Sequence, residues 1–518
     1  MKNIPSIFND IIGPVMRGPS SSHCAGALRI GRMARDLMGG SIFQVEIEYD
    51  TMGSLATTHI SQGSDMGLFC GLLGYDVTDE LLLNYKEEII NHNISIDIKY
   101  KKLNDAHPNT YNLLLKNGQD NHKIKAISTG GGMVEVIEID GVAVNINGGY
   151  FETVLFVDEL ITNWIEIISG KINAEEISLK AGDKFFVNIK TTFKIDDDVI
   201  LEIKKICNAV EVKTIFPVLP VLSKKEIIIP FTTADEMIEY NMNKRLQLWE
   251  LALEYESKRG DVPKEEVMRM MDEITKVIIN CVETGLNGTE FNDRILPAQS
   301  LNFNKLNDEN KLLGSGLQNL MILYISAIME VKSSMGVIVA APTAGSCGAC
   351  PGAIYAAVKY LQKDSCEMSK ALLIAGLIGV FIAYKSTFAA EEAGCQAETG
   401  AGAGMAAAAL VYLNGGSVEQ SLGAASMAIQ NSLGLICDPI ANRVEAPCIG
   451  RNVMAAVNAL ACANMALANY LHLIQFDEVI DVYDEVGRKI SREYRCTGLG
   501  GLSATNSART LEAKLNLK

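Results

Sequence analysis

In the first 150 residues, segments with the hydrophobic spacing of a helix are interspersed with segments that have the spacing of a strand. Apolar positions recur at helical spacing in residues 20–38 and 54–73, and Gly74 closes the second of these predicted helices. Alternation of apolar and polar positions predicts strands at residues 43–49, 94–100, 123–127 and 133–139. We therefore expect a mixed α/β domain over residues 1–150.

The pattern weakens over residues 151–230. Residues 185–193 alternate, and residues 211–222 are rich in β-branched side chains but carry Pro217 and Pro220. Proline removes a ladder donor, so this end is predicted to be a linker. We interpret the stretch as a small α+β segment.

Almost all of residues 231–518 carry a helical pattern. Residues 235–260 and 263–285 are amphipathic, residues 313–332 are apolar, and small residues dominate after Pro342. The predicted fold class is an α+β N-terminal domain followed by a mostly all-α catalytic domain.

Composition narrows the possible functions. The chain has 518 residues and a formal charge of −16, which argues against nucleic-acid or anionic-membrane partners, because Lys and Arg hold both. Twelve cysteines and no secretory leader favour a cytoplasmic protein with reduced thiols and metal use. The longest apolar run, residues 371–384, is shorter than the roughly 20 residues of a membrane span and predicts a buried helix.

Three cysteines stand beside helix-breaking residues in the C-terminal half: Cys395, Cys437 and Cys448. Cysteines at helix ends can direct thiolates at one shared object, and soft sulfur ligands suit iron–sulfur clusters or zinc. Three ligands would leave one metal position open for catalysis. Spacing alone leaves inert buried cysteines as the alternative, because no short CxxC framework joins the three.

Several short sequence motifs indicate one family. GCQAETG, CDPIANRVEAPCIGRN and APTAGSCGACPGA lie in the helical half, and GPSSSHCAGALRIGRMARDL, GSLATTHISQGSD, DAHPNT and STGGGMVEVIEIDG lie before it. Together they resemble the single-chain form of the iron–sulfur-dependent L-serine dehydratases. The resemblance covers nearly the whole chain and is weakest over residues 151–235 and 244–313. The family often carries a small regulatory ACT module in the first of these stretches.

The resemblance implies β-elimination of L-serine to pyruvate and ammonia. A [4Fe–4S] cluster on Cys395, Cys437 and Cys448 would act as a Lewis acid on the hydroxyl. The residues implied to orient the substrate are Ser20, Ser22, His23, Thr129, Gly130, Gly131, Pro342, Thr343 and Gly345. The serines are also ordinary helix-cap candidates, and the glycines are ordinary loop residues. Cys347 and Cys350 form a CxxC pair that stays unassigned.

Two positions depart from the family pattern. Gln62 stands where the family usually has an active-site histidine, and glutamine cannot act as a base near neutral pH. His59, on the same face of the predicted helix, is our candidate to replace it. Some members use a terminal cysteine as a removable iron ligand, whereas Cys496 here lies well before the end and would either replace it or be a buried thiol.

No histidine lies between residues 123 and 471, so a hydrolase triad confined to the helical half is excluded. Any histidine acting at the cluster should come from the N-terminal domain, which would place the active site at a domain interface. The partners expected are a small amino-acid substrate and a second copy of the chain in a homodimer. The alternatives are a lyase of the same fold acting on threonine or cysteine, a pyridoxal-phosphate enzyme, and a non-enzymatic iron–sulfur sensor.

Overall fold

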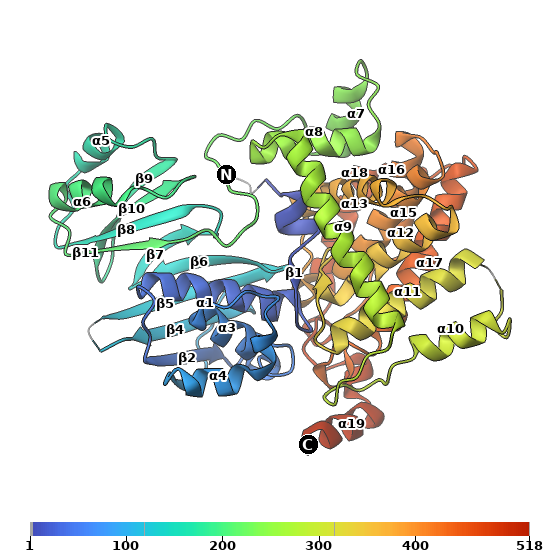
Figure 1. Ribbon diagram of the computed structural model, residues 1–518, viewed down its shortest axis with the longest axis horizontal. Helices are drawn as coiled ribbons and strands as arrows, with labels where there is room; N and C mark the ends of the chain where they lie inside the picture. The colour runs from blue at the N-terminus through green and yellow to red at the C-terminus, as the bar shows by residue number, and fades with distance from the viewer. Residues whose placement is uncertain (1–3, 119, 315, 517–518) are drawn as a thin grey trace. The chain divides into compact units, whose positions relative to one another are not determined.

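The chain forms two compact units. The computed structural model describes residues 4–118, 120–314 and 316–516. One unit comprises Met1–Ser22 and Ile228–Lys518, and the other is His23–Ile227. The second unit holds the two larger sheets, and the first is mostly helical (Figure 1). The predicted fold class, an α+β region followed by a mostly helical region, is confirmed.

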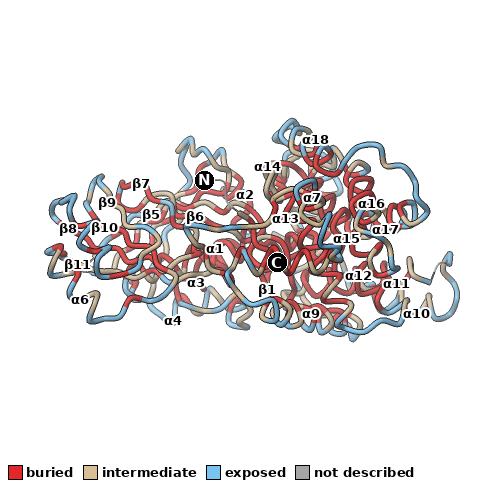
Figure 2. The backbone as a smooth tube through the Cα atoms, turned by 90° about the horizontal axis from the view of Figure 1, so that it is seen from above, coloured by how far each residue is buried: buried red, intermediate tan, exposed pale blue. Residues whose placement is uncertain are grey.

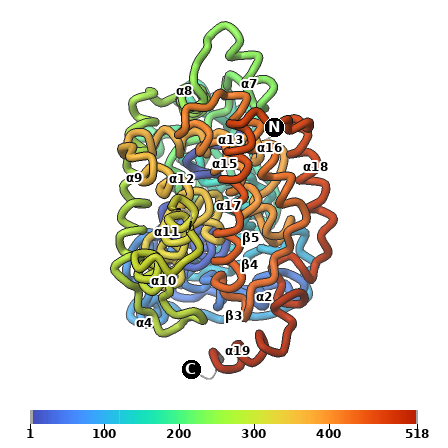
Figure 3. Tube along the Cα trace, turned by 90° about the vertical axis from the view of Figure 1, so that its right-hand side faces the viewer, coloured from blue at the N-terminus to red at the C-terminus, as the bar shows by residue number. Residues whose placement is uncertain are grey.

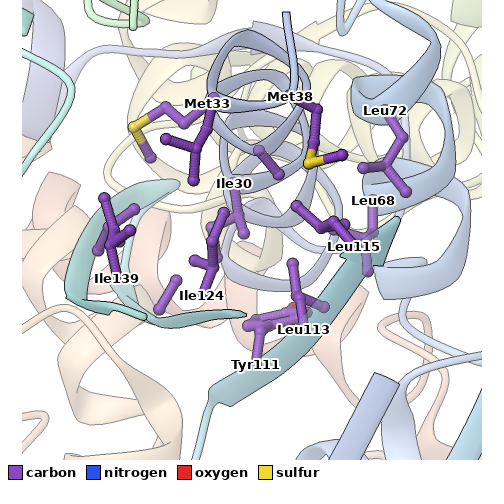
Figure 4. Close-up of a cluster of buried hydrophobic side chains, with 14 of the residues drawn as sticks. Ile30, Met33, Met38, Leu68, Leu72, Tyr111, Leu113, Leu115, Ile124 and Ile139 are labelled. Carbon is purple, nitrogen blue, oxygen red and sulfur yellow. The ribbon is translucent and has the colours of Figure 1, made fainter. Parts of the chain in front are cut away.

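The main sheet of the second unit has the strand order β3-β2-β4-β5-β6-β7. Only β2 and β3 are parallel within it. Its strands are β2 (Gln44–Asp50), β3 (Ser95–Lys101), β4 (Thr110–Lys116), β5 (Asn121–Gly130), β6 (Met133–Ile139) and β7 (Val142–Ile146). Helices α1 (Gly26–Leu37) and α3 (Ser64–Leu73) direct apolar side chains at it, as Figure 4 shows for Ile30 and Leu68.

Helices α1 and α3 approach each other closely. A Cβ atom at Gly31 would overlap the carbonyl oxygen of Leu68, and one at Gly71 would overlap that of Leu28. Glycine is therefore required on both helices for their backbones to touch.

Two predicted helix details are wrong. The helix predicted over residues 54–73 is split into α2 (Leu55–Thr58) and α3, because Gly63 adopts a left-handed φ of 88°. The serines of the first motif do not cap α1. They enter a π-helical turn, η2 (Ser21–Ala25), and α1 follows with no side-chain cap.

A second sheet follows in the same unit. The chain order is β8 (Phe151–Val157), α5 (Trp164–Ser169), β9 (Glu176–Ala181), β10 (Phe185–Thr191), α6 (Asp197–Ile206) and β11 (Glu211–Ile215). The sheet order is β11-β8-β10-β9, antiparallel throughout. This β-α-β-β-α-β order is ferredoxin-like. It gives a defined topology to a stretch whose sequence pattern indicated only a small α+β segment.

Helices of small residues form the centre of the mostly helical unit. Figure 3 shows α13 (Ser365–Lys385), α15 (Ala401–Leu413) and α17 (Cys448–Leu467) together. Helices α13 and α15 are buried along most of their length, whereas α17 has one buried and one exposed side (Figure 2). Around them lie α8 (Leu248–Gly260), α9 (Lys264–Leu286), α10 (Ser300–Asp308), α11 (Gly316–Ser333), α12 (Ala349–Tyr360), α16 (Val418–Gln430) and α18 (Phe476–Lys489). Among the described residues α13 alone is long and apolar enough to cross a membrane, and 78% of its apolar window is buried in the fold. The amphipathic stretch predicted as one helix over residues 235–260 is two, α7 (Ala234–Asn241) and α8.

The N-terminal segment packs with the helical unit rather than with the strands that follow it. Ile7 and Ile11, in the turn η1 (Ile7–Ile11), lie against the glycines of α13. The buried carboxylate of Glu256 on α8 accepts from the backbone N–H of Ile7 at 2.8 Å. Strand β1 (Val15–Met16) pairs with β12 (Ile338–Val339). Residues up to Ser22 therefore belong to the helical unit, although the sequence pattern included them in a domain over residues 1–150.

The buried carboxyl of Glu152 on β8 should make the stability of the folded protein depend on pH. Burial raises the pKa of its carboxyl to about 8, opposed by Lys190 and by a 2.8 Å hydrogen bond from Asn188. Between about pH 4.5 and 8 the unfolded chain releases this proton while the folded protein keeps it, so stability falls as pH rises. Each pKa unit corresponds to about 1.4 kcal/mol, so the loss should reach a few kcal/mol.

We expect Glu152→Gln to remove most of this dependence. The measurement is the midpoint of thermal unfolding at pH 6 and pH 8.5, with Glu166→Gln, at an exposed position of α5, as the control. Equal pH dependence in wild type and Glu152→Gln would contradict the prediction.

Candidate active site and metal centre

Three buried cysteines meet in the helical unit, and a fourth, Cys448, lies outside their cluster but near enough to Cys395 to be affected by its charge. Cys395 precedes the turn η5 (Gln396–Gly400), Cys448 begins α17, and Cys437 and Cys496 lie in loops. Cys395, Cys437 and Cys496 belong to one buried cluster, and all four are 2–7% exposed. The thiols of Cys395 and Cys437 and a carboxylate oxygen of Glu398 lie within 4.8 Å of one another. This group could hold a metal ion.

Backbone hydrogen bonds fix Cys437 beside Cys496. The N–H of Cys437 donates to the carbonyl of Tyr494 at 2.8 Å, and the N–H of Cys496 donates to the carbonyl of Cys437 at 2.9 Å. Cys496 adopts a φ of 59°, which is uncommon for a residue with a side chain. Hydrogen bonds to the thiols of Cys395 and Cys496, with burial, raise the pKa of Cys437 well above its usual value.

Positive charge lies next to these sulfurs. Nη1 of Arg451 is 3.6 Å from Sγ of Cys395, and Nη2 pairs with Asp438 at 2.6 Å. Lys332 on α11 is completely buried and donates to the carbonyl of Val444. Burial raises the pKa of Cys448, and the charges of Lys332 and Arg451 oppose that rise.

The loop that contains Pro342, Thr343 and Gly345 borders the cysteine cluster. The hydroxyl of Thr343 donates to Oε1 of Glu398 at 2.6 Å. A Cβ atom at Gly345 would lie 2.6 Å from that same oxygen, so the contact requires glycine. The side chain of Asn452 donates to the carbonyl of Gly345 at 2.9 Å and accepts from the N–H of Ala349 at 2.8 Å.

The serines of the first motif reach the same region of the helical unit. The backbone N–H of Ala344 donates to Ser21 at 3.2 Å, and the hydroxyls of Ser20 and Ser22 are 3.3 Å apart. Ser22 also donates to Glu391 at 3.2 Å. The predicted substrate-binding serines and loop thus lie in one unit with the predicted metal ligands.

The remaining predicted residues, which are His23, His59, Gln62 and Thr129–Gly131, lie in the second unit. Four of the sequence motifs are connected there by hydrogen bonds. Nε2 of His23 is 3.0 Å from the hydroxyl of Thr58. The N–H of Ser54 donates to the carbonyl of Pro108 at 2.9 Å. The N–H of Ser128 donates to the carbonyl of Asn109 at 3.1 Å, which connects DAHPNT to STGGG.

His59 is held on both ring nitrogens. Nδ1 lies 2.8 Å from Asp65, and Nε2 lies 2.7 Å from the hydroxyl of Tyr100. A carboxylate only accepts, so Nδ1 carries the proton, and in the neutral ring Nε2 accepts from Tyr100. Gln62 is buried in the turn before α3, so the expectation that it shares a helical face with His59 is wrong.

The glycine triplet forms a tight hairpin. Gly130 pairs with Met133 across the β5–β6 turn, and Gly130 and Gly131 have φ of 104° and 61°. Thr129 is the preceding residue of β5. Positive φ at successive positions explains why this hairpin uses glycine.

The CxxC pair lies outside the cysteine cluster. Cys347 and Cys350 are completely buried, and Sγ of Cys347 contacts the sulfur of Met329 at 3.7 Å. Burial raises the pKa of Cys347 to about 12. These thiols belong to the packing of α11 against α12.

Sequence reasoning missed several polar groups at these sites. Glu398 stands inside the word GCQAETG, and burial raises its pKa to about 7, with the hydrogen bond from Thr343 opposing. Asn109 is buried, and neither polar atom of its side chain has a hydrogen-bond partner in the structure. Glu398 and Asn109 could have been found because they lie inside the motifs GCQAETG and DAHPNT. The sequence around Lys332 contains nothing that predicts its burial.

Comparisons with known proteins agree on one family. The family model described as "Serine dehydratase alpha chain" matches residues 243–503. The probable L-serine dehydratase alpha chain of Bacillus subtilis is 36% identical over 285 residues, which is 55% of this chain and 95% of the relative. The L-serine dehydratase of Streptomyces coelicolor and the L-serine dehydratase 2 of Escherichia coli are each 26% identical over 497 residues, covering 94% of this chain and 96% of the relative.

Asn452 should be essential for the loop that borders the cysteines. Asn452→Ala leaves the buried N–H of Ala349 and carbonyl of Gly345 unpaired, and each such group costs about 1–3 kcal/mol. We expect the midpoint of thermal unfolding to fall by several degrees. Asn464→Ala, on the exposed side of the same helix, is the matched control. An unchanged midpoint in Asn452→Ala would show that these hydrogen bonds contribute nothing.

Proposed function

The chain belongs to the serine dehydratase alpha-chain family, and on that premise we propose that it converts L-serine to pyruvate and ammonia with a [4Fe–4S] cluster on Cys395, Cys437 and Cys448. The observation that carries the proposal is the group of buried thiols brought together from separate helix ends beside Glu398. Thiolates are the usual protein ligands of such clusters. When bound, the cluster supplies a Lewis-acidic iron for the substrate hydroxyl.

The donor set fits a cluster better than a disulfide or an inert core. The described residues contain no disulfide, and all twelve cysteines are free. Arg451 and Lys332 supply positive charge beside sulfurs that must ionise to bind iron. Arg451 is already paired with Asp438, whereas buried Lys332 donates its hydrogen bond to the neutral carbonyl of Val444, so thiolates nearby would help to offset the burial of Lys332.

The substrate is oriented in this proposal by residues of both motif groups. Ser20, Ser22 and the Pro342–Gly345 loop lie beside the cysteines, and their hydroxyls and backbone N–H groups suit an amino-acid substrate. His23 and the Thr129–Gly131 backbone are proposed to bind the same substrate.

His59 is the proposed base. Asp65 fixes its tautomer, so the lone pair on Nε2 is the acceptor, and Tyr100 must release that nitrogen before it takes the α-proton. Loss of the α-proton and of the hydroxyl, which leaves as water, gives aminoacrylate. Tautomerisation to the imine and hydrolysis, which consumes one water, give pyruvate and ammonia.

Cys496 is proposed as the thiolate that covers the open iron at rest. It lies with Cys395 and Cys437 in the buried cluster. Its backbone N–H donates to the carbonyl of Cys437, and its thiol is also hydrogen-bonded to the thiol of Cys437, so its sulfur already faces a proposed ligand.

The setting proposed for this reaction is the cytoplasm, with a homodimer as the working assembly and no nucleic-acid or membrane partner. Gln62 favours a second candidate, the same elimination on threonine or cysteine, because a neutral amide in place of a titratable ring changes the proton exchange available.

The ligand assignment predicts the iron content of variants. Cys395→Ser, Cys437→Ser and Cys448→Ser should each lose bound iron, whereas Cys366→Ser, at an exposed thiol, should keep it. Cys496→Ser should keep iron but lose it faster in air, because no thiolate then covers the fourth position. The measurement is iron and sulfide per chain after anaerobic purification, followed by an α-keto acid assay on serine, threonine and cysteine.

Full iron in any of the three ligand variants would reject the assignment. A wild-type protein with intact cluster and no turnover of the three amino acids would favour an iron–sulfur sensor instead.

The base assignment predicts a loss of turnover without a loss of iron. His59→Ala should lower kcat by about 10²–10⁴, the usual weight of general acid–base catalysis. His92→Ala, at an exposed histidine, is the control. Gln62→His should be tolerated, or shift the preference among serine, threonine and cysteine, as kcat/KM will show. A fully active His59→Ala enzyme would exclude His59 as the base.

A further inference from the structure

Glu398 is the least buried member of the group that it forms with Cys395 and Cys437. Cys395 and Cys437 are almost completely buried, whereas the Glu398 side chain keeps partial access. Its Oε2 lies 3.9 Å from Sγ of Cys395. A carboxylate is therefore presented beside the proposed metal ligands, where a small molecule could reach it.

The surrounding structure holds both oxygens of this carboxylate: a hydroxyl donates to Oε1, and the thiol of Cys395 donates to Oε2. A Cys395 thiolate bound to a metal would no longer donate, which would leave Oε2 to the substrate. Oε1 accepts from Thr343 at 2.6 Å, and the missing side chain at Gly345 gives it room. Asn452 in turn holds the carbonyl of Gly345. Cys395 and Glu398 are three residues apart around the π-helical turn η5, a form found frequently at functional sites. The turn therefore presents a thiol and a carboxylate from one short segment.

The charges nearby select the kind of group that would bind. Glu391, which accepts from Ser22, adds a second carboxylate close enough to act electrostatically on Glu398. The buried Lys332 is the cation that acts on it, and its ammonium donates to the carbonyl of Val444. A carboxylate attracts an ammonium, so Glu398 suits the α-ammonium of an amino acid, whereas Lys332 and Arg451 suit negatively charged groups beside it.

We propose that Glu398 binds the α-ammonium of the substrate and so selects amino acids over hydroxy acids. The inference rests on the proposed elimination at the cluster. The hydroxyl and ammonium of serine stand on adjacent carbons, so a hydroxyl held at a cluster on Cys395 would place the ammonium within reach of Oε2, which lies 3.9 Å from Sγ of Cys395. Loss of a hydrogen bond to a charged group would weaken binding about 10- to 100-fold.

The test compares L-serine with D- and L-glycerate, which carry a hydroxyl in place of the ammonium. In reconstituted holoenzyme, Glu398→Gln should raise the KM for serine at least about 10-fold and leave the inhibition constant of glycerate within about 2-fold. Iron per chain should not change. If turnover is too low to measure, the change in visible absorbance of the cluster on titration with each compound gives the same comparison.

Two variants complete the design. Glu398→Asp keeps the charge and should retain much of the preference for serine. Glu392→Gln removes a neighbouring charge that acts on Arg488 and should change neither constant. Parallel changes for serine and glycerate would overturn the inference, and so would loss of iron from Glu398→Gln, which would make Glu398 a ligand. Failure of the proposed function would appear separately, as a wild-type protein without serine turnover.

Discussion

Burial of sulfur constrains the helical unit more than any other single feature. Desolvation raises the pKa of Cys448, and thiol–thiol hydrogen bonds and burial raise that of Cys437, so neither ionises readily in the protein alone. A bound metal removes the proton from a coordinating thiol outright. Loading of the cluster and tightening of these loops should therefore be one coupled event. The loops that carry Cys395, Cys437 and Cys496 meet through backbone hydrogen bonds, which hold the three sulfurs close together.

The hydrophobic pattern was sufficient to predict the class of fold but not its breaks. Alternating positions in residues 133–139 match β6, and the small-residue stretch after Pro342 became the buried helices α12, α13 and α15. The break between α2 and α3 was missed because the apolar period continues across it. Helix α2 ends at Thr58, and Gly63, with its left-handed backbone, begins α3. The ferredoxin-like sheet was missed because a strand such as β9 has few buried positions, so its alternation is weak.

For the candidate site, too, some residues could be predicted from the sequence and others could not. The cysteines could be named from sequence words, since those words carry the chemistry locally. Glu398 lies in one of these words but was passed over, because its role depends on Thr343 and Gly345, more than fifty residues away in the chain. His59 was chosen by elimination, and its partners Asp65 and Tyr100 come from a helix start and an edge strand that no local pattern connects. Packing across the chain decides such contacts.

The buried cations complete the physical argument for a metal centre. An isolated buried ammonium costs several kcal/mol unless it is paired, and the hydrogen bond from Lys332 to Val444 is to a neutral carbonyl. Arg451 is paired with Asp438 yet also directs Nη1 at Cys395. A cluster bound by thiolates would bring negative charge to the place where these two side chains are already fixed. The cations would then lower the cost of ionising the ligands, and the thiolates would lower the cost of burying Lys332 beyond what its carbonyl partner provides.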